Sequence, residues 1–190
     1  MAVVTVRAKL VGVSPLSFSK AIVEKKDSGE SHDVFEKRTW KQRCHVDANG
    51  ECYIPPQAIK NCLSEAAKFL GESVPGKKSA TYTKHFDAGV MVVEPIKLGI
   101  KLDDVKSTEV FVPSDGKKGG GTRVWKTFPM IYQWSGESEI LLLDPILADK
   151  PEKVREYLEK AGQFIGLGRW RPRNGGMNGR FKVEAFKVVK

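Results

Sequence analysis

A turn, a short strand and a helix follow one another between Val46 and Gly71, in the sequence VDANGECYIPPQAIKNCLSEAAKFLG. Residues 47–50 predict the turn and residues 51–54 the strand. Pro55 or Pro56 suits the first position of a helix, because the N–H group that proline lacks would have no partner there. Apolar side chains then recur at helical spacing up to Gly71, a residue typical of a helix end; they are Ile59, Cys62 or Leu63, Ala66 and Leu70. This segment predicts a strand that leads directly into an amphipathic helix.

Strand patterns dominate the rest of the chain. They cover residues 2–13, 89–100 with a bend at Pro95, 107–115, 122–134, 139–147 and 180–189. A second helix is predicted from Pro151 to Ala161, with Asp149 as its N-cap and Gly162 as its end. The order of the elements indicates an α+β fold, in which one domain over residues 1–190 has a ferredoxin-like (RRM-like) βαββαβ palm with helices on one face of the sheet.

Three polar segments interrupt this pattern as insertions into the palm, at residues 18–46, 72–88 and 113–122. The charged stretch from Glu24 to His45 predicts a mobile loop or a long hairpin arm. The second segment predicts a basic connection without regular periodicity. The run GKKGGG at residues 116–121 predicts the most flexible element of the chain.

The balance of charge favours polyanionic partners. Lysine and arginine outnumber aspartate and glutamate by 32 to 23, which gives a net charge of +9 and an isoelectric point near 9.4. Nucleic acid is the first candidate for such a surface and an anionic membrane the second. No stretch approaches the roughly 20 apolar residues of a membrane span, and the N-terminus begins with a strand pattern. We therefore expect a cytoplasmic protein without a membrane partner.

The cysteines do not predict a metal site. Cys44, Cys52 and Cys62 form an odd set without a CxxC pair, which favours reduced thiols. A zinc site with His45 would be the alternative, but structural zinc ligands usually come in closely spaced pairs.

The sequence GESVPGKK at residues 71–78 is close to a phosphate-binding loop, yet a helix precedes it and Lys78 replaces the residue that would hold magnesium. We expect neither a metal nor a cofactor.

The segment from Gly162 to Lys182 carries four arginines, one lysine, six glycines and no acid. Glycine lets the backbone approach a ligand where a β-carbon would collide, and arginine offers forked donors to phosphate. Trp170 lies between Arg169 and Arg171 and offers a face to a base, although aromatic residues at such positions pack into cores at least as often. The alternative is a solvated hairpin loop. Because no acid balances the arginines, the segment favours an anionic ligand.

Basic residues form four clusters along the chain. Each alone is typical of a solvated surface, but clusters that converge on one groove would form a track for single-stranded nucleic acid, and aromatic residues accompany three of them. Lys117, Lys118 and Arg123 would then close over the strand from their loop. The predicted nucleic-acid contacts are Arg38, Lys41 and Arg43; Lys77, Lys78, Lys84 and His85; Lys117, Lys118, Arg123, Trp125 and Lys126; and Arg169, Trp170, Arg171, Arg173 and Arg180.

The histidines do not form a catalytic motif. His32, His45 and His85 are far apart in the sequence, and a nuclease that used one of them as a general base would need a second group to stabilise the leaving oxygen. No known spacing places such a group beside them. We expect His85 to be exposed in a basic loop and to contact phosphate, and we expect no catalytic residue.

Together these pieces resemble the RAMP superfamily, the ferredoxin-like RNA-binding proteins of CRISPR systems. The resemblance rests on IPPQAIKNCLSEAAKFL at residues 54–70, KHFDAGVMV at residues 84–92 and GLGRWRPRNGGMNGRF at residues 166–181. The chain looks most like the backbone subunits, which polymerise along the guide RNA. It is shorter than most of them, and its glycine-rich segment is not the compact G-φ-G-x5-G-φ-G form of the guide-processing nucleases of the superfamily.

The resemblance implies a palm with long insertions as fingers and thumb, which binds RNA without reading its sequence and without catalysis. The expected partners are single-stranded nucleic acid, RNA before DNA, and further copies in a homo-oligomer or filament. Other CRISPR subunits join them if the chain belongs to such a complex. Two alternatives stay open: a guide-RNA-processing endoribonuclease of the same superfamily with one of the histidines as its base, or a phage-borne single-strand-binding or inhibitor protein.

Overall fold

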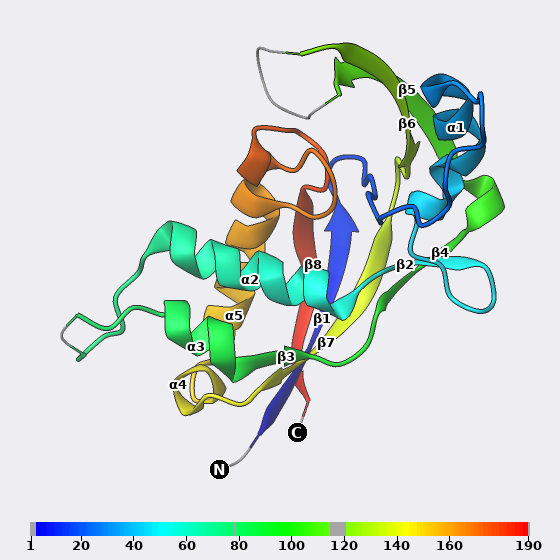
Figure 1. The fold of residues 1–190 in the computed structure, drawn as a ribbon. Coiled ribbons are helices and arrows are strands. Elements are labelled where there is room, and N and C mark those ends of the chain that lie inside the picture. Colours follow the sequence, from blue (N-terminus) through cyan, green and yellow to red (C-terminus); the bar gives the residue numbers. More distant parts are fainter. Residues whose placement is uncertain (1–2, 78, 115–120, 190) are drawn as a thin grey trace.

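A four-stranded antiparallel sheet forms the centre of the molecule. The computed structural model describes residues 3–77, 79–114 and 121–189. The strand order is β3-β7-β1-β8, and every neighbouring pair is antiparallel. The strands are β1 (Val4–Gly12), β3 (Val90–Val92), β7 (Ser135–Leu142) and β8 (Phe181–Val189). Because β1 and β8 are neighbours, both termini lie at one end of the sheet (Figure 1).

Two helices, α2 (Pro56–Leu70) and α5 (Pro151–Lys160), pack against one face of this sheet. Strands and helices therefore follow the chain as β1, α2, β3, β7, α5 and β8, and the sheet has the strand order of a ferredoxin-like palm. The predicted α+β ferredoxin-like fold is confirmed.

The alternation of side chains along β1 explains which face is covered. Val6, Ala8 and Leu10 are fully buried beneath the helices, as alternate residues of a half-buried strand must be. Between them, Arg7 and Lys9 lie on the open face, where Arg7 pairs with Glu139 of β7 at 2.8 Å and Lys9 with Glu184 of β8 at 2.6 Å. The core therefore lies between the sheet and the two helices.

Two smaller sheets flank the palm. Strand β2 (Glu51–Ile54) pairs with β4 (Ile96–Lys101), and β5 (Lys106–Pro113) pairs with β6 (Arg123–Met130). The second pair forms a two-stranded arm that projects from the body at the end opposite the chain termini (Figure 1). The helix after Pro55 and the other predicted strands are confirmed, but the strand predicted at residues 139–147 ends at Leu142, because Pro145 begins a short helix. The bend at Pro95 separates strands of two different sheets.

The stretch between Glu24 and His45 is not the predicted loop or hairpin arm. It contains α1 (His32–Thr39) and a 3-10 helix (Trp40–Arg43). Ser31 caps α1, since its hydroxyl accepts a hydrogen bond from the N–H of Val34. Helix α1 packs beside β6 and is held by ion pairs, notably Arg43 with Glu36 at 2.8 Å. Ion pairs therefore stabilise a helix that lacks a continuous hydrophobic stripe.

A helix also forms where the sequence predicted only a basic connection. Helix α3 spans Thr83–Gly89. Phe86 is fully buried and stacks on Tyr157 of α5 with ring centroids 4.4 Å apart. A seven-residue helix is marginal in isolation, so this contact with α5 stabilises a helix that has no periodic pattern of its own.

The boundaries of the second predicted helix need correction. Asp149 does not cap it; Asp144 instead caps the short helix α4 (Pro145–Ala148), where its carboxylate accepts from the N–H of Ile146. Gly162 does not end α5, because the chain continues through a π-helical turn at Ala161–Ile165. Residues 116–120 of the predicted flexible run lie outside the described residues.

Candidate nucleic-acid interface

The glycine-rich segment at residues 166–180 folds back on itself. Gly179 has a left-handed φ of 71°, and a β-carbon there would collide with the carbonyl of Leu167. A β-carbon on Gly176 would collide with the carbonyl of Trp170. We expected these glycines to make room for a ligand, and that interpretation is wrong, since the chain's own backbone fills the space. The glycines instead fix a compact loop that holds its arginines in place.

Phe128, near the base of the β5–β6 arm, is the point where three distant segments meet. The guanidinium carbon of Arg169 lies 3.5 Å from the centroid of the Phe128 ring, and that of Arg43 lies 4.8 Å from it. The ring of Trp170 meets Phe128 edge to face at 5.4 Å. The glycine-rich segment, the arm and the end of the α1 region are thus joined through one aromatic ring.

This junction, which we call the Phe128 cluster (Arg43, Phe128, Arg169 and Trp170), carries excess positive charge. Glu36 accepts two hydrogen bonds from Nη2 of Arg43, at 2.9 and 2.8 Å, and so offsets one of the two guanidiniums. Burial, and then the charge of Arg43, lower the pKa of Arg169 to about 10, so Arg169 stays charged at neutral pH. The Nε atoms of both arginines are buried without a hydrogen-bond partner. An anion beside the two guanidinium groups would relieve the repulsion between them.

The β5–β6 arm presents exposed aromatic rings beside a cation. Phe111 and Trp125 are directly opposite one another in the register, with ring centroids 5.2 Å apart, and remain 47% and 46% exposed. The guanidinium carbon of Arg123 lies 5.3 Å from the ring of Phe111. Lys126 points to the other face of the arm and is half-buried. The two ring planes are tilted by 41°, and an exposed aromatic pair next to an arginine offers ring faces on which a base can stack.

Several of the predicted contact residues already have acidic partners within the chain. Arg38 pairs with Glu24, Asp27 and Glu30; Lys41 pairs with Asp103 at 2.7 Å; Arg171 pairs with Glu65 at 2.8 Å. Arg180 donates to the carbonyl oxygen of Gln163. Arg173 is exposed, and no described residue pairs with it. Arg173 is therefore the arginine of this segment that is best placed to meet a phosphate.

The cluster around Lys77 and Lys84 does not join the others. Figure 1 shows residues 72–77 and 79–82 at the end of α2 that lies farthest from the arm. The prediction that all four basic clusters converge on one groove is wrong for this one, because α2 extends the segment away from the arm. Lys77 and Lys84 are exposed at this distant end. Lys78, Lys117 and Lys118 lie outside the described residues.

His85 is not exposed, so the prediction of an exposed phosphate contact at this position is wrong. It lies in α3 at 6% exposure, and its Nδ1 is 2.8 Å from a carboxylate oxygen of Asp144. Its Nε2 is buried without a partner among the described residues. His32 is exposed at the start of α1. His45 lines a small pocket with Lys20, and burial, followed by the charge of Lys20, lowers its pKa.

The described residues contain no group of three or more His, Cys, Asp or Glu side chains close enough to hold a metal ion. All three cysteines are buried, and burial raises the pKa of the Cys62 thiol to about 12. In this part of the chain, no helix has the length and the apolar character needed to cross a membrane.

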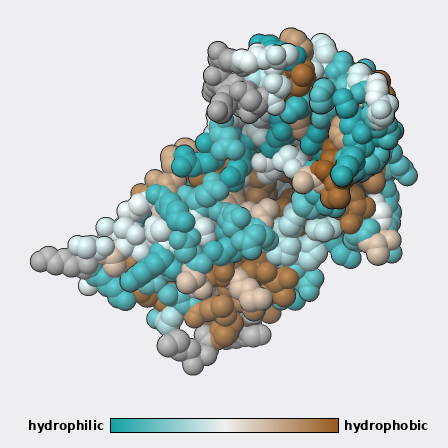
Figure 2. All heavy atoms as spheres, in the orientation of Figure 1, coloured by the Kyte–Doolittle hydropathy of each residue, from teal (hydrophilic) through white to brown (hydrophobic). Residues whose placement is uncertain are grey.

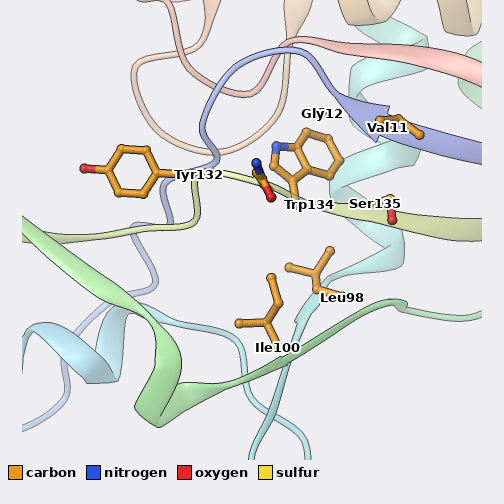
Figure 3. Close-up of a pocket in the computed structure, with 8 residues that line it drawn as sticks. Val11, Gly12, Leu98, Ile100, Tyr132, Trp134 and Ser135 are labelled. Atoms are coloured by element: carbon orange, nitrogen blue, oxygen red, sulfur yellow. The ribbon is translucent and has the colours of Figure 1, made fainter.

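A further pocket, of about 410 Å³, lies between the end of β1 and β4 (Figure 3). Leu98 and Ile100 of β4 point toward the indole of Trp134, whereas Tyr132 points away from them. Its lining residues include no charged group, so this pocket does not offer a phosphate site. Trp134 serves the fold instead, because its indole N–H donates to the carbonyl oxygen of Ser14 at 3.0 Å.

Comparison with known proteins places the architecture among CRISPR subunits. A chain of the type III-B Cmr-beta structure bound to cognate target RNA matches with a TM-score of 0.61 and 12% identity over 99% of this chain. Our chain spans 61% of the length of that one. Cmr6 from Pyrococcus furiosus matches with a TM-score of 0.52 and 13% identity, over 96% of this chain and 99% of its own.

At the level of sequence, no family model matches the chain and no curated protein matches it significantly. The predicted likeness to RAMP-type CRISPR subunits is confirmed by the structural neighbours. At identities this low it is a likeness of fold. The chain has the fold of RAMP-type subunits of CRISPR complexes.

Proposed function

We propose that this protein is a non-catalytic subunit that binds single-stranded RNA and associates with further copies of itself along the strand, as in a CRISPR-type ribonucleoprotein. The observation that carries the proposal is the Phe128 cluster, which joins two charged arginines and a tryptophan at the base of an arm with exposed aromatic rings. The fold is shared with a chain whose structure was determined with bound target RNA, which supports RNA as the ligand.

The geometry supports recognition of backbone and base faces. Arg173 and Arg169 would contact phosphates, with Arg43 beside Arg169 as a further positive charge. Phe111 and Trp125 would stack on a base, since every base has a flat face. Contacts of these two kinds do not read base edges, so the protein should bind mixed sequences with similar affinity.

A measurement on freshly purified protein tests the ligand class. A 260 to 280 nm absorbance ratio above that of pure protein, which falls after RNase but not after DNase treatment, is the expected result. Protein free of nucleic acid, with no affinity for added single strands, would contradict the proposal. A ratio that DNase alone lowers would reassign the ligand to DNA.

Self-association is tested with strands of increasing length. The protein mixed with RNA that is long enough for several subunits should form particles whose mass rises in equal steps, as multi-angle light scattering measures. A single bound copy at every RNA length would contradict association along the strand.

The nuclease alternative is tested with repeat hairpin RNA. His45 is the histidine closest to a catalytic setting, because it lines a pocket of about 180 Å³ with Lys20. We expect the RNA to stay intact with the wild-type protein. Cleavage that His45→Ala abolishes would overturn the non-catalytic assignment in favour of an endoribonuclease. An inhibitor that docks on an acidic protein would instead elute with that protein and show no RNA affinity.

A further inference from the structure

Strand β3 has a free edge. It pairs with β7 on one side and ends the sheet order on the other. The N–H of Val93 donates to Glu139 at 3.1 Å, and the N–H of Leu143 donates to Gly89 at 2.8 Å, so the backbone of residues 89 and 93 faces β7. In an antiparallel pair the direction alternates along the strand. The carbonyl of Val90 and both the N–H and the carbonyl of Val92 therefore point away from the sheet.

These outward groups are unpaired within the part of the chain that the structure describes. They face a pocket of about 260 Å³ between the edge of β3 and the first turns of α2. Its lining is Pro56, Gln57 and Lys60 of α2 and Val90, Met91 and Val92 of β3. A groove between an edge strand and a helix is the geometry in which an extended peptide adds to a sheet.

The surface beside this edge is apolar. Met91, Leu143 and Val93 are 51%, 42% and 36% exposed. Figure 2 shows a hydrophobic area below α2, over the place where Figure 1 labels β3. The other edge of the sheet differs, because β8 carries exposed charges, Lys182, Glu184 and Lys187. Charged side chains protect an edge against added strands, so β8 is protected and β3 is not.

The groove is also positively charged. Nζ of Lys60 donates to the carbonyl oxygen of Asp87 at 2.7 Å and to Oγ of Ser64 at 3.2 Å, and no carboxylate pairs with it among the described residues. Lys60 lies in the second turn of α2. A carboxylate on the added segment would complement its charge.

We propose that the free edge of β3 binds an extended segment of a partner protein, which adds as a fifth strand with apolar side chains over Met91 and a carboxylate toward Lys60. A second copy of this chain fits less well. If the second copy added its β8 edge, its Lys182 and Lys187 would approach Lys60 of the first copy and repel it. If it added its β3 edge, the two Lys60 side chains would repel one another. The site is independent of the Phe128 cluster.

Selection of short random peptides displayed on phage against the intact protein tests the proposal. Enriched peptides should share alternating apolar residues and one acid, and the affinity of their synthetic versions is measured by fluorescence anisotropy. Val92→Pro removes the outward N–H and leaves the bonds to β7; we expect affinity to fall at least about 10-fold. In hydrogen exchange, the amide of Val92 should become protected when the peptide binds.

Lys60→Glu gives a second test that leaves the strand unchanged. Lys60→Glu should lower the affinity for acidic peptides at least about 10-fold, whereas Lys187→Glu at the other edge should leave this affinity unchanged. If Val92→Pro fails to fold, Lys60→Glu and the exchange of Val92 decide the question. Peptides that bind all variants equally, or no enrichment at all, would overturn the proposal. Dimerisation through this edge, lost in Val92→Pro, would assign it to a second copy and would also contradict the proposal. RNA affinity should be unchanged in Val92→Pro, which separates this site from the proposed RNA interface.

Discussion

The guanidinium carbon of Arg169 lies 3.5 Å from the centroid of the Phe128 ring, which joins the glycine-rich segment to the base of the β5–β6 arm. The two residues are 41 positions apart in the sequence. Arg43 approaches the same ring at 4.8 Å. Arg169 is half-buried, so the attraction between its charge and the ring is only partly screened by water.

A double-mutant cycle measures this contact. Phe128→Leu and Arg169→Gln, separately and together, should show a coupling of about 0.5–2 kcal/mol in the free energy of unfolding by urea. The control cycle combines Phe128→Leu with Arg155→Gln on α5. The effects of these two substitutions on the free energy of unfolding should add. Additive effects for Phe128 and Arg169 as well would mean that the ring does not stabilise the cation.

Arg173 should matter for RNA and not for stability. It is exposed without an acidic partner in the described structure, so Arg173→Gln removes a phosphate contact and breaks no internal bond. We expect affinity for single-stranded RNA to fall about 5-fold and the salt slope to decrease by about 0.7. Arg155→Gln, with the same loss of charge, should have little effect. An RNA affinity that Arg173→Gln leaves unchanged would remove this residue from the interface.

Arg171→Gln should behave in the opposite way. Arg171 is bonded to Glu65 of α2 at 2.8 Å and its side chain is 22% exposed. Its loss leaves Glu65 partly buried without its partner, so the melting temperature should fall while RNA binding by the folded protein changes less than in Arg173→Gln. Thermal melts and anisotropy on the same samples distinguish the two arginines. If Arg171→Gln and Arg173→Gln changed the melting temperature and the RNA affinity to the same extent, Arg171 could not be assigned to the fold and Arg173 to RNA contact.

Glu72 should make stability depend on acid pH. Hydrogen bonds from Lys153, and then from Tyr157, lower the pKa of Glu72, with burial opposing them. Its stabilising effect is therefore present above the unfolded value of 4.5 and is lost as pH falls through the lower folded value. Because Glu72 is partly exposed, Glu72→Gln should lower the free energy of unfolding by less than about 1 kcal/mol at neutral pH. The difference between the melts of the two proteins should shrink as pH falls below the unfolded value of 4.5; a constant difference throughout the acid range would contradict this account.

Gly179 and Gly50 offer a matched pair for the compact glycine-rich loop. Both have positive φ, 71° and 76°, but a β-carbon on Gly179 would meet the carbonyl of Leu167, whereas Gly50 has open space. Gly50→Ala should cost about 1 kcal/mol from backbone strain alone. Gly179→Ala should cost clearly more, about 2–4 kcal/mol, because the backbone must also move. Equal losses in urea unfolding would mean that the loop is not packed as described.

The palm could be predicted because its signals are local. Alternation in residues 2–13 marks β1, and the prolines before Gln57 with the glycine after Leu70 mark α2. Helices α1 and α3 could not be predicted in this way. Helix α1 depends on ion pairs such as Arg43 with Glu36, and α3 depends on the stacking of Phe86 on Tyr157. Neither contact produces the periodic apolar pattern by which a helix is recognised in sequence.

The candidate site could be predicted in composition but not in arrangement. The basic and aromatic character of residues 166–180 was visible, yet Phe128, on which Arg43 and Arg169 meet, has no special signal in its own sequence. Whether a cation is free also depends on tertiary contacts. Arg38 and Arg173 look alike in sequence, but the first pairs with three acids and the second with none in the described residues.

The affinity for single-stranded RNA as a function of salt tests the central claim most directly. Anisotropy with a mixed-sequence RNA between about 50 and 300 mM KCl should give a log–log slope of about −2, since each neutralised phosphate contributes about −0.7 and the interface offers the three cations Arg43, Arg169 and Arg173. Arg173→Gln should make this slope shallower, and Arg155→Gln should not. An affinity that stays constant over the range, or no binding at low salt, would contradict an RNA interface at the Phe128 cluster.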